Sequence, residues 1–320
     1  MAVDALFQPV VLFFLLGSLA AFARSDLAVP EAVAKTIALY LMMSIGLRGG
    51  GEVAHSGLTG AMLIAGGCGL ALSFLLPLPA FWALRTLGRL DRTNAAAVAA
   101  HYGSVSVVTF AAGSEVLRAI GMAPAGFMVA VLALMETPAV LTGLLLAKRG
   151  QGDALAARGG LLHETFFNGS VVLLVGSFII GVIAGEKGFA PIAPVFDTLF
   201  KGMLCIFLLD MGLVAARRLM DRRALSLRTA ALAIALPVAN GTLGASLGVV
   251  AGLDAGSAAA LAILAGSASY IAVPAVMRLA LPEANPGLYL GMSLAVTFPF
   301  NLTIGIPYYA WVASQLHGMI

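Results

Sequence analysis

Two short stretches decide the fold: residues 101–110 read HYGSVSVVTF, and residues 264–274 read LAGSASYIAVP. Each places Gly and Ser, and the second also Pro, inside a long apolar segment where a continuous helix would otherwise run. Gly and Pro interrupt the hydrogen-bond ladder of a helix, and Ser and Thr hydroxyls can satisfy the freed backbone groups or contact a ligand. We therefore expect one interrupted helix in each half of the chain.

The composition around these stretches is that of a membrane protein. Of the 320 residues, 61% are hydrophobic and only 10% are charged, and the mean hydropathy is +1.01. A soluble chain carries about 25% charged residues to solvate its surface, so the composition excludes a soluble enzyme. The net charge of +3 is too balanced for nucleic-acid binding. Two cysteines and four scattered histidines give no disulfide framework and no metal-ligand spacing.

Apolar runs long enough to cross about 30 Å of hydrocarbon predict the membrane spans. We read the first run as a helix and not as a signal peptide, because no basic segment precedes it. The ten predicted spans cover residues 5–22, 29–47, 58–83, 94–113, 123–147, 162–184, 195–215, 225–252, 255–280 and 287–314.

The basic residues predict the orientation. Thirteen Lys and Arg residues fall in the loops after the odd-numbered spans, and only three fall in the opposite loops. Because Lys and Arg near helix ends are retained on the cytoplasmic side, both termini are expected outside the cytoplasm, in the plasma (inner) membrane of a bacterium. The dense cluster from Arg217 to Arg228 is read as a topology signal, with contact to lipid headgroups as a secondary role.

The second half of the chain repeats the first at a spacing of about 160 residues. Since each half would hold five spans, an odd number, the halves run oppositely through the membrane, as in secondary transporters. The predicted fold is therefore all-α and polytopic, with ten helices in a 5+5 inverted repeat, helices 4 and 9 broken, and a cytoplasmic linker at 148–164 between halves 1–147 and 165–320. The matching anchors are Gly17-Ser18 with Gly176-Ser177, Ser44–Leu47 with Asp210–Leu213, Leu90-Asp91 with Leu253-Asp254, Gly103–Ser106 with Gly266–Ser269, and Thr137-Pro138 with Phe298-Pro299.

The paired interruptions are the candidate substrate site. Two half-helix N-termini that meet near the midplane offer free N–H groups and positive dipole ends, which suit a small anion. The alternative is that the small residues only allow close helix packing. The candidate anion-binding residues are Gly103, Ser104, Ser106, Thr109, Gly266, Ser267 and Ser269.

A cation site is predicted beside the interruptions. Glu136 lies inside the fifth span, where a central carboxylate costs at least about 2.5 kcal/mol, and Thr137 and a proline follow it. At the corresponding position of the second half stand Thr297 and Asn301. Their oxygens and a proline-freed carbonyl suit a hard cation such as sodium. The alternatives for Glu136 are an ion pair with Arg278 or an interfacial depth.

Four further ionisable residues have open roles. Three roles are open for Asp210, in the seventh span: it binds a cation, it exchanges a proton, or it accepts a hydrogen bond from a neighbouring helix. Glu115 and Arg278 lie toward the ends of the broken spans and can reach the interface by snorkelling. His101 stands two residues before Gly103, where pH sensing is the functional alternative to a structural role.

Segments spread over nearly all spans carry a family resemblance, and they include Val29–Ala32, Ser44–Gly50, Gly103–Ser106, Met135–Ala139, Leu199–Gly202, Met211-Gly212 and Ala284–Gly291. Through these segments the chain resembles the sodium-dependent bicarbonate permease family of cyanobacterial carbon-concentrating systems. The resemblance implies ten helices in a 5+5 inverted repeat, trimers, and inward symport of bicarbonate with sodium as the coupling ion and no other cofactor. It also implies a cytoplasmic inhibitor of the nitrogen-regulator type as a candidate partner.

The chain departs from the family pattern at the interruptions. The family's Asp before the Pro step is Glu136 here, which keeps the charge, and its Ser-Ser-Asp stretch reads Ser267–Tyr270. Its Gly-Ser-Thr is Val107–Thr109 here, and the linker at 148–164 is short. These changes bear on sodium stoichiometry and on bicarbonate specificity.

Two other functions therefore stay open beside bicarbonate symport. One is a sodium- or proton-coupled carrier of another small, organic anion, with Asp210 as the titrating group. The other is a membrane receptor that binds without transporting. In the carrier hypotheses, spans 3–5 and 8–10 form a mobile core, and spans 1, 2, 6 and 7 form the scaffold and the oligomer contact.

Overall fold

A computed structural model describes residues 7–57, 59–148, 169–220 and 225–319. Over these ranges the chain is helical, without a strand. Eight of the described helical stretches are long and apolar enough to cross a membrane, which is the architecture of a polytopic membrane protein. They are Glu31–His55, Gly60–Thr86, Arg92–Ala119, Met128–Ala147, Val172–Phe189, Pro194–Met220, Leu227–Val250 and Pro286–His317.

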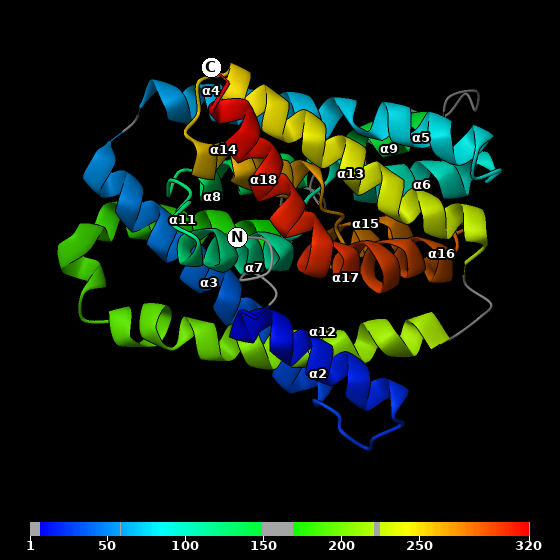
Figure 1. The fold of residues 1–320 in the computed structure, drawn as a ribbon, viewed down its shortest axis with the longest axis horizontal. Helices are drawn as coiled ribbons and strands as arrows, with labels where there is room; N and C mark the ends of the chain where they lie inside the picture. Colours follow the sequence, from blue (N-terminus) through cyan, green and yellow to red (C-terminus); the bar gives the residue numbers. More distant parts are fainter. Residues whose placement is uncertain (1–6, 58, 149–168, 221–224, 320) are drawn as a thin grey trace.

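Within each half of the described chain the elements follow one another with short connections (Figure 1). Those of the first half are α2 (Pro9–Phe22), α3 (Glu31–Ser56), α4 (Gly60–Leu75), α5 (Pro77–Thr86), α6 (Arg92–Gly103), α7 (Val107–Ala119), α8 (Met128–Glu136) and α9 (Pro138–Lys148). The second half holds α11 (Gly169–Phe189), the π-helical η1 (Pro194–Thr198), α12 (Phe200–Met220), α13 (Leu227–Val250), α14 (Ala255–Ala265) and α15 (Ala272–Ala280). It ends with α16 (Pro286–Leu290), the π-helical η2 (Gly291–Thr297), α17 (Phe298–Phe300), the π-helical η3 (Asn301–Gly305) and α18 (Ile306–His317).

Two of the ten predicted spans are not among these eight long apolar stretches of the described chain. The span predicted at 5–22 corresponds to α2, which has 14 residues, and the span at 255–280 is divided between α14 with 11 residues and α15 with 9. Residues 266–271 between α14 and α15 do not continue the helix, so the predicted span is divided there. A count of ten therefore stays a prediction. The predicted linker at 148–164 lies outside the described residues except for the end of α9.

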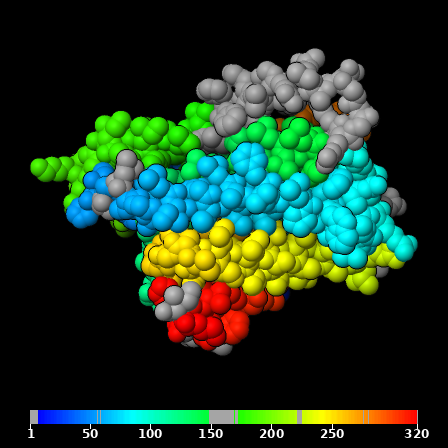
Figure 2. Space-filling model, turned by 90° about the horizontal axis from the view of Figure 1, so that it is seen from above, coloured from blue at the N-terminus to red at the C-terminus, as the bar shows by residue number. Residues whose placement is uncertain are grey.

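The helices form two groups in space (Figure 1). An outer group, made of α2, α3, α11 and α12, lies along the lower and left edges of the view. A body group, made of α4 to α9 and α13 to α18, fills the rest. Figure 2 shows α4 and α5 lying alongside α13 across one face of the body. The two groups correspond to the helices that the sequence assigns to scaffold and core.

Glycines hold the outer group together by close backbone contact. A Cβ on Gly46 of α3 would lie 2.3 Å from the Ser177 hydroxyl of α11, and a Cβ on Gly212 of α12 would lie 2.1 Å from the carbonyl oxygen of Phe14 on α2. The Ser18 hydroxyl of α2 donates to the Gly212 carbonyl at 3.4 Å. Thus the α3–α11 and α2–α12 pairs use the same chemistry, a glycine of one helix against a serine-bearing turn of the other.

Each interrupted span begins at an aspartate cap. Asp91 accepts the amide N–H of Asn94 at 2.9 Å and starts α6, and Asp254 accepts the amide N–H of Ser257 at 2.9 Å and starts α14. Partial burial raises the pKa of the Asp91 carboxyl, but hydrogen bonds from Asn94 and from the backbone at Asp91 and Thr93 together outweigh burial and leave that pKa below its ordinary value. The carboxylate is therefore charged when it caps the positive end of the helix.

The caps also join the two halves. The Asn94 side-chain oxygen accepts the amide N–H of Asn285 at 2.8 Å, in front of α16. The Ser257 hydroxyl accepts the amide N–H of Ala125 at 3.1 Å, in front of α8. The start of each interrupted span is thus tied to a loop of the opposite half, which fixes how the two spans approach one another.

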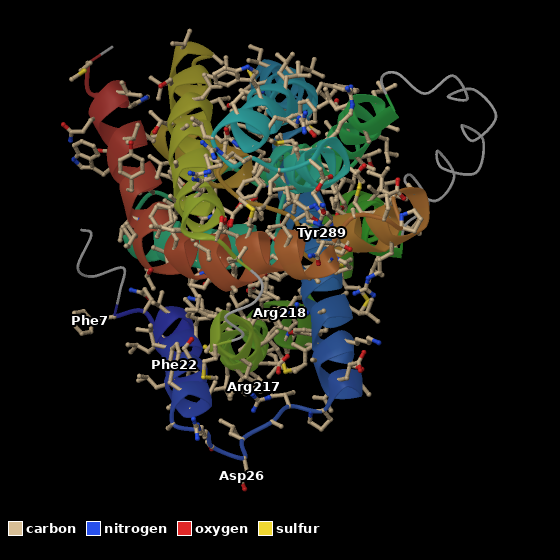
Figure 3. All side chains as sticks on the ribbon, turned by 90° about the vertical axis from the view of Figure 1, so that its right-hand side faces the viewer. Phe7, Phe22, Asp26, Arg217, Arg218 and Tyr289 are labelled. Carbon is tan, nitrogen blue, oxygen red and sulfur yellow. The ribbon has the colours of Figure 1, made fainter. Side chains whose placement is uncertain are left out.

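Basic residues gather at the end of the outer group where α2 and α12 finish. Arg217 donates to the Leu27 carbonyl at 2.8 Å, so α12 is held to the loop after α2. Figure 3 shows Arg217 and Arg218 on the same side of the molecule as Phe22 and Asp26. The positive-inside rule predicts that this end faces the cytoplasm.

The α2–α12 contact predicts a sharp difference between two glycines of one helix. In G212A the new methyl group overlaps the α2 backbone, and we expect a loss of about 1–3 kcal/mol in the free energy of unfolding. In G202A no atom outside its own helix lies within 4 Å of the new Cβ, so the better helix propensity of alanine should raise the free energy of unfolding by up to about 1 kcal/mol. Denaturant unfolding of the detergent-solubilised protein measures both. Equal effects of the two substitutions would contradict the packing described here.

Candidate functional site

The first interruption lies between α6 and α7. α6 ends at Gly103, and Ser104 and Ser106 are extended, with ψ of 176° and 111°. The Ser106 hydroxyl then caps α7 by accepting the amide N–H of Thr109 at 3.2 Å, and it also accepts the Thr109 hydroxyl at 2.9 Å. A serine hydroxyl thus replaces the helical partner of a first-turn amide, so a new helix starts inside the span.

The second interruption lies between α14 and α15. Gly266 follows the last residue of α14, and the Ser267 hydroxyl donates to a carbonyl of the last turn at 2.8 Å. The amide N–H of Val273 points at the Ser269 hydroxyl at 3.4 Å, at the start of α15. Pro274 falls in the first turn, where a helix has no use for its missing N–H.

The two interruptions cross and hydrogen-bond to one another. The amide N–H of Ser106 donates to the Ser267 hydroxyl at 3.0 Å, and the amide N–H of Ser269 donates to the His101 carbonyl at 2.9 Å. The predicted anion-binding serines and Thr109 are no more than 4% exposed. The crossing brings together two helix N-termini, of α7 and α15, and two C-termini, of α6 and α14. Positive and negative dipole ends therefore meet at one buried place.

Four buried polar groups on the elements of the crossing or packed on them have an atom without a hydrogen-bond partner in the described structure: His101 Nε2, Glu136 Oε2 and the hydroxyls of Tyr270 and Tyr289. The His101 ring stacks on Tyr289 at 4.6 Å, and its Nδ1 lies 2.7 Å from the Ala97 carbonyl. Because a carbonyl only accepts, Nδ1 carries the proton, and Nε2 of the neutral ring is an acceptor. A buried polar atom without a partner costs about 1–3 kcal/mol, so such a group of atoms is typical of a ligand site.

The two glycines of the crossing have a packing role. A Cβ on Gly103 would lie 2.3 Å from Pro77 Cγ, and a Cβ on Gly266 would lie 2.5 Å from the Tyr309 hydroxyl. The packing alternative therefore applies to these glycines, whereas the serines and Thr109 use their hydroxyls on backbone amides and carbonyls and on one another.

The first pair of predicted cation ligands lies where α8 meets α9. Glu136 ends α8, Thr137 follows, and a proline begins α9. The Ser104 hydroxyl donates to the Glu136 backbone carbonyl at 2.9 Å, and the Ser73 hydroxyl donates to the Met135 carbonyl at 2.7 Å. Side chains thus satisfy carbonyls at a helix junction where a proline offers no N–H. Glu136 is 4% exposed.

The second pair lies on the π-helical part of the last span. The Thr297 hydroxyl donates to the Ala233 carbonyl at 2.6 Å and accepts the Tyr102 hydroxyl at 2.6 Å. The Asn301 side-chain amide donates to the Gly266 carbonyl at 2.8 Å. In π-helical turns the regular backbone pairing shifts, which is common at functional sites.

The structure arranges the four predicted cation ligands as two pairs. Glu136 lies against the first interrupted span through the Ser104 hydroxyl, and Asn301 lies against the second through the Gly266 carbonyl. Thr297 bonds Tyr102 of the first interrupted span and Ala233 of α13. Within the described ranges no hydrogen bond joins one pair to the other, and no group of three His, Cys, Asp or Glu residues forms a metal cluster. A single four-residue cation site stays a prediction.

The other ionisable residues are placed as follows. Asp210 is buried on α12, which packs on α2, α3 and η2. Arg278 is exposed on α15, and no ion pair joins it to Glu136 in the described chain. Glu115 does not extend to the surface as snorkelling requires: it is 5% exposed and pairs with Arg118 at 3.1 Å and Lys201 at 3.0 Å. In the described chain, therefore, Glu136 has no ion pair with Arg278 and Glu115 does not snorkel, while the role of Asp210 stays open.

Sequence reasoning missed three side chains near the crossing. Tyr102 and Tyr289 read as ordinary apolar packing in a span, yet one hydrogen-bonds Thr297 and the other covers His101. Asn240 of α13 donates to the Tyr102 carbonyl at 3.2 Å. The sequence offered one signal for these residues, because Asn240 is a polar side chain inside an apolar span.

The serine contact across the crossing predicts a stability effect. In Ser267→Ala the buried amide of Ser106 loses its acceptor, and we expect the free energy of unfolding to fall by about 1–3 kcal/mol. Ser246→Ala is the control, because the Ser246 hydroxyl only donates to a carbonyl of its own helix. Denaturant unfolding in detergent compares the two variants. An effect of S267A no larger than that of S246A would contradict the importance of the crossing contact.

Comparison with known proteins adds one finding. A family model described as the Na+-dependent bicarbonate transporter superfamily matches residues 9–314 of the chain. The match runs from α2 to α18 and includes both interrupted spans. No curated protein matches.

Proposed function

The chain belongs to the Na+-dependent bicarbonate transporter superfamily, and from this premise we propose that it carries bicarbonate into the cytoplasm together with sodium. Transport proceeds by alternating access in a bacterial inner membrane, with both termini outside the cytoplasm. The observation that carries the proposal is the buried crossing, where two half-helix N-termini meet beside polar atoms that lack partners.

The anion is assigned to the N-terminal ends of α7 and α15. First-turn amides have no partner within their own helix, so those of Val107 and Val108 are available to an anion's oxygens. Bicarbonate also carries an O–H group, and His101 Nε2 offers a buried acceptor for a donor of this kind. The hydroxyls of Ser106 and Ser269 set the positions of the two helix starts.

The cation is assigned to the other two helix ends at the crossing, those of α6 and α14. The C-termini of α6 and α14 present carbonyl oxygens with negative dipole ends, which suit sodium in carriers with broken helices. Glu136 supplies the only carboxylate among the proposed ligands, and its Oε2 has no hydrogen-bond partner in the described chain. We assign Glu136 and Thr137 as the primary ligands, with Thr297 and Asn301 as their counterparts in the other half.

Paired contacts support an inverted repeat of ten helices. Gly46 meets Ser177 as Gly212 meets the turn at Ser18, and each residue stands at the repeat position of its counterpart. Asp91 and Asp254 cap corresponding helices in the same way. In this proposal the outer group is the scaffold, and the body group moves against it. Movement is required because the crossing is buried in the present conformation.

Tyr270 favours a second candidate function. It stands at the crossing where the family resemblance expects an acid, and its ring packs edge-on against Phe298 at 5.2 Å. An aromatic ring there changes the shape of the site, which favours another small, organic anion, coupled to sodium or, through Asp210, to protons. A non-transporting receptor is the less favoured alternative, and counterflow in liposomes separates it from a carrier. A trimer and a nitrogen-regulator-like inhibitor remain proposed partners.

Sodium-driven uptake tests the proposed function. Purified protein in liposomes should accumulate labelled bicarbonate under an inward sodium gradient and not when potassium replaces sodium. Glu136→Gln should lower the initial rate by about tenfold or more, which corresponds to about 1.4 kcal/mol, because a neutral amide does not balance the charge of a buried cation. Glu283→Gln is the control, since Glu283 is exposed on a loop.

Two results would contradict the proposal. Uptake at the same rate in potassium would show that transport is not coupled to sodium. No uptake by folded protein, together with uptake of a small organic anion, would assign the second candidate function instead.

A further inference from the structure

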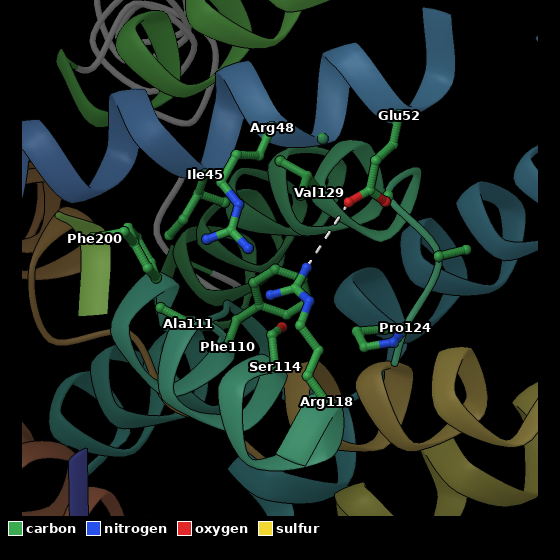
Figure 4. Close-up of a pocket in the computed structure, with 13 residues that line it drawn as sticks. Ile45, Arg48, Glu52, Phe110, Ala111, Ser114, Arg118, Pro124, Val129 and Phe200 are labelled. Carbon is green, nitrogen blue, oxygen red and sulfur yellow. Dashed lines mark ion pairs between the residues drawn. The ribbon is translucent and has the colours of Figure 1, made fainter. Parts of the chain in front are cut away.

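A second polar cavity lies away from the crossing, between α3, α7 and the segment before α8 (Figure 4). Its volume is about 30 Å³, and it opens toward a recess of about 670 Å³. The cavity and the recess share Arg48, Glu52, Ala125 and Gly126. In the proposed topology, Arg48 and Arg118 belong to the side opposite the cytoplasm, so the recess faces outward.

A buried hydroxyl without a partner points into this cavity. Ser114 is 5% exposed, and its Oγ has no hydrogen-bond partner in the described structure. Figure 4 shows the Ser114 hydroxyl directed from α7 toward the two guanidinium groups. A serine within a helix usually bonds a carbonyl of the preceding turn when it is buried, so this orientation leaves the hydroxyl available to a ligand.

Two arginines reach the same cavity from different helices. Arg48 comes from α3 and rests over the Phe200 ring at 5.0 Å, and Arg118 comes from α7 (Figure 4). Arg48 pairs with Asp197 through Nε at 3.2 Å and with Glu115 through Nη2 at 3.7 Å. A guanidinium has five N–H donors, so these pairs leave the Nη1 edge of Arg48 for another acceptor.

The ion pairs around the cavity join three cations to three carboxylates, and Arg48, Arg118 and Glu115 are the least exposed of the six. Glu115 is the buried carboxylate of the cluster, and Arg48, Arg118 and Lys201 all pair with it. Asp197 is 54% exposed at the rim, and the pair from Glu52 to Arg118 is long, at 4.0 Å. Two partly buried arginines thus face one buried carboxylate, and a second anion can enter on the free side of the guanidinium groups.

We propose that Arg48, Arg118 and Ser114 form an outer binding site for a small planar oxyanion of the bicarbonate or formate class, occupied before the anion reaches the crossing. The guanidinium groups donate to the anion's oxygens, and the Ser114 hydroxyl donates to an oxygen or accepts the O–H of bicarbonate. The site rests on the proposed function only for its place in the transport path.

Uptake kinetics and direct binding test the outer site separately. In liposomes, Ser114→Ala should raise the KM for external bicarbonate by about tenfold and leave kcat within about twofold. Arg118→Gln should raise the KM at least as much. For binding, the rise in unfolding temperature that sodium formate causes, relative to sodium chloride at equal ionic strength, should fall by about half or more in S114A.

Ser246→Ala and Arg228→Gln are the matched controls. Ser246 bonds only within α13, and Arg228 is exposed at the start of the same helix. S114A changes one atom and keeps every ion pair, so it stays informative if R118Q does not fold.

The outcomes distinguish this proposal from the proposed function. Formate stabilisation that S114A diminishes, in a protein without bicarbonate uptake, supports the outer site and rejects the transport assignment. Bicarbonate uptake with an unchanged KM in S114A, and formate stabilisation equal to that of the wild type, overturns the outer site and leaves the transport assignment standing.

Discussion

A helix that breaks inside a membrane exposes backbone N–H and C=O groups that hydrocarbon cannot hydrogen-bond, and the rest of this structure depends on how that constraint is met. Here serine hydroxyls meet it. Ser106 caps the helix that follows the first break, and Ser267 accepts the Ser106 amide from the second. Each interrupted span accepts a backbone N–H of the other, so the two spans must lie across one another. The crossing places helix ends of both signs in one buried place, as the proposed binding of an anion and a cation requires.

The remaining helices position this crossing. Glycines bring α3 against α11 and α2 against α12, so the outer group forms two tight pairs. The body group carries the breaks, and the caps at Asp91 and Asp254 hold the starts of its interrupted spans. Toward the other end of α7, Glu115 gathers three cations beside an open recess. One helix therefore links a buried crossing at its N-terminus to a charged cavity at its C-terminal end.

Much of this was predictable from the residues, because local chemistry ends helices. Gly103 and Gly266 mark the two breaks, and the hydroxyls beside them were expected to satisfy freed backbone groups, as Ser106 does for the Thr109 amide. The cation ligands were less accessible. Glu136 and Thr297 share a repeat position, which suggested one cluster, but the Glu136 carbonyl accepts from Ser104, whereas the Thr297 hydroxyl bonds Tyr102 and Ala233. The role of Glu115 was not predictable, because its partners Arg48 and Lys201 lie far away in the sequence.

By itself the sequence determined that the chain spans a membrane and where two of its spans break, since apolar run length and the chemistry of Gly, Pro and Ser act locally, and it predicts which halves correspond. Only the tertiary structure decided which polar groups meet. Ser106 and Ser267 are separated by 161 residues, and nothing in either segment alone names the other. Likewise, Ser114 reads as one more small residue in an apolar helix until packing turns its hydroxyl toward two arginines. Partner choice depends on how helices pack, and packing is a property of the whole chain.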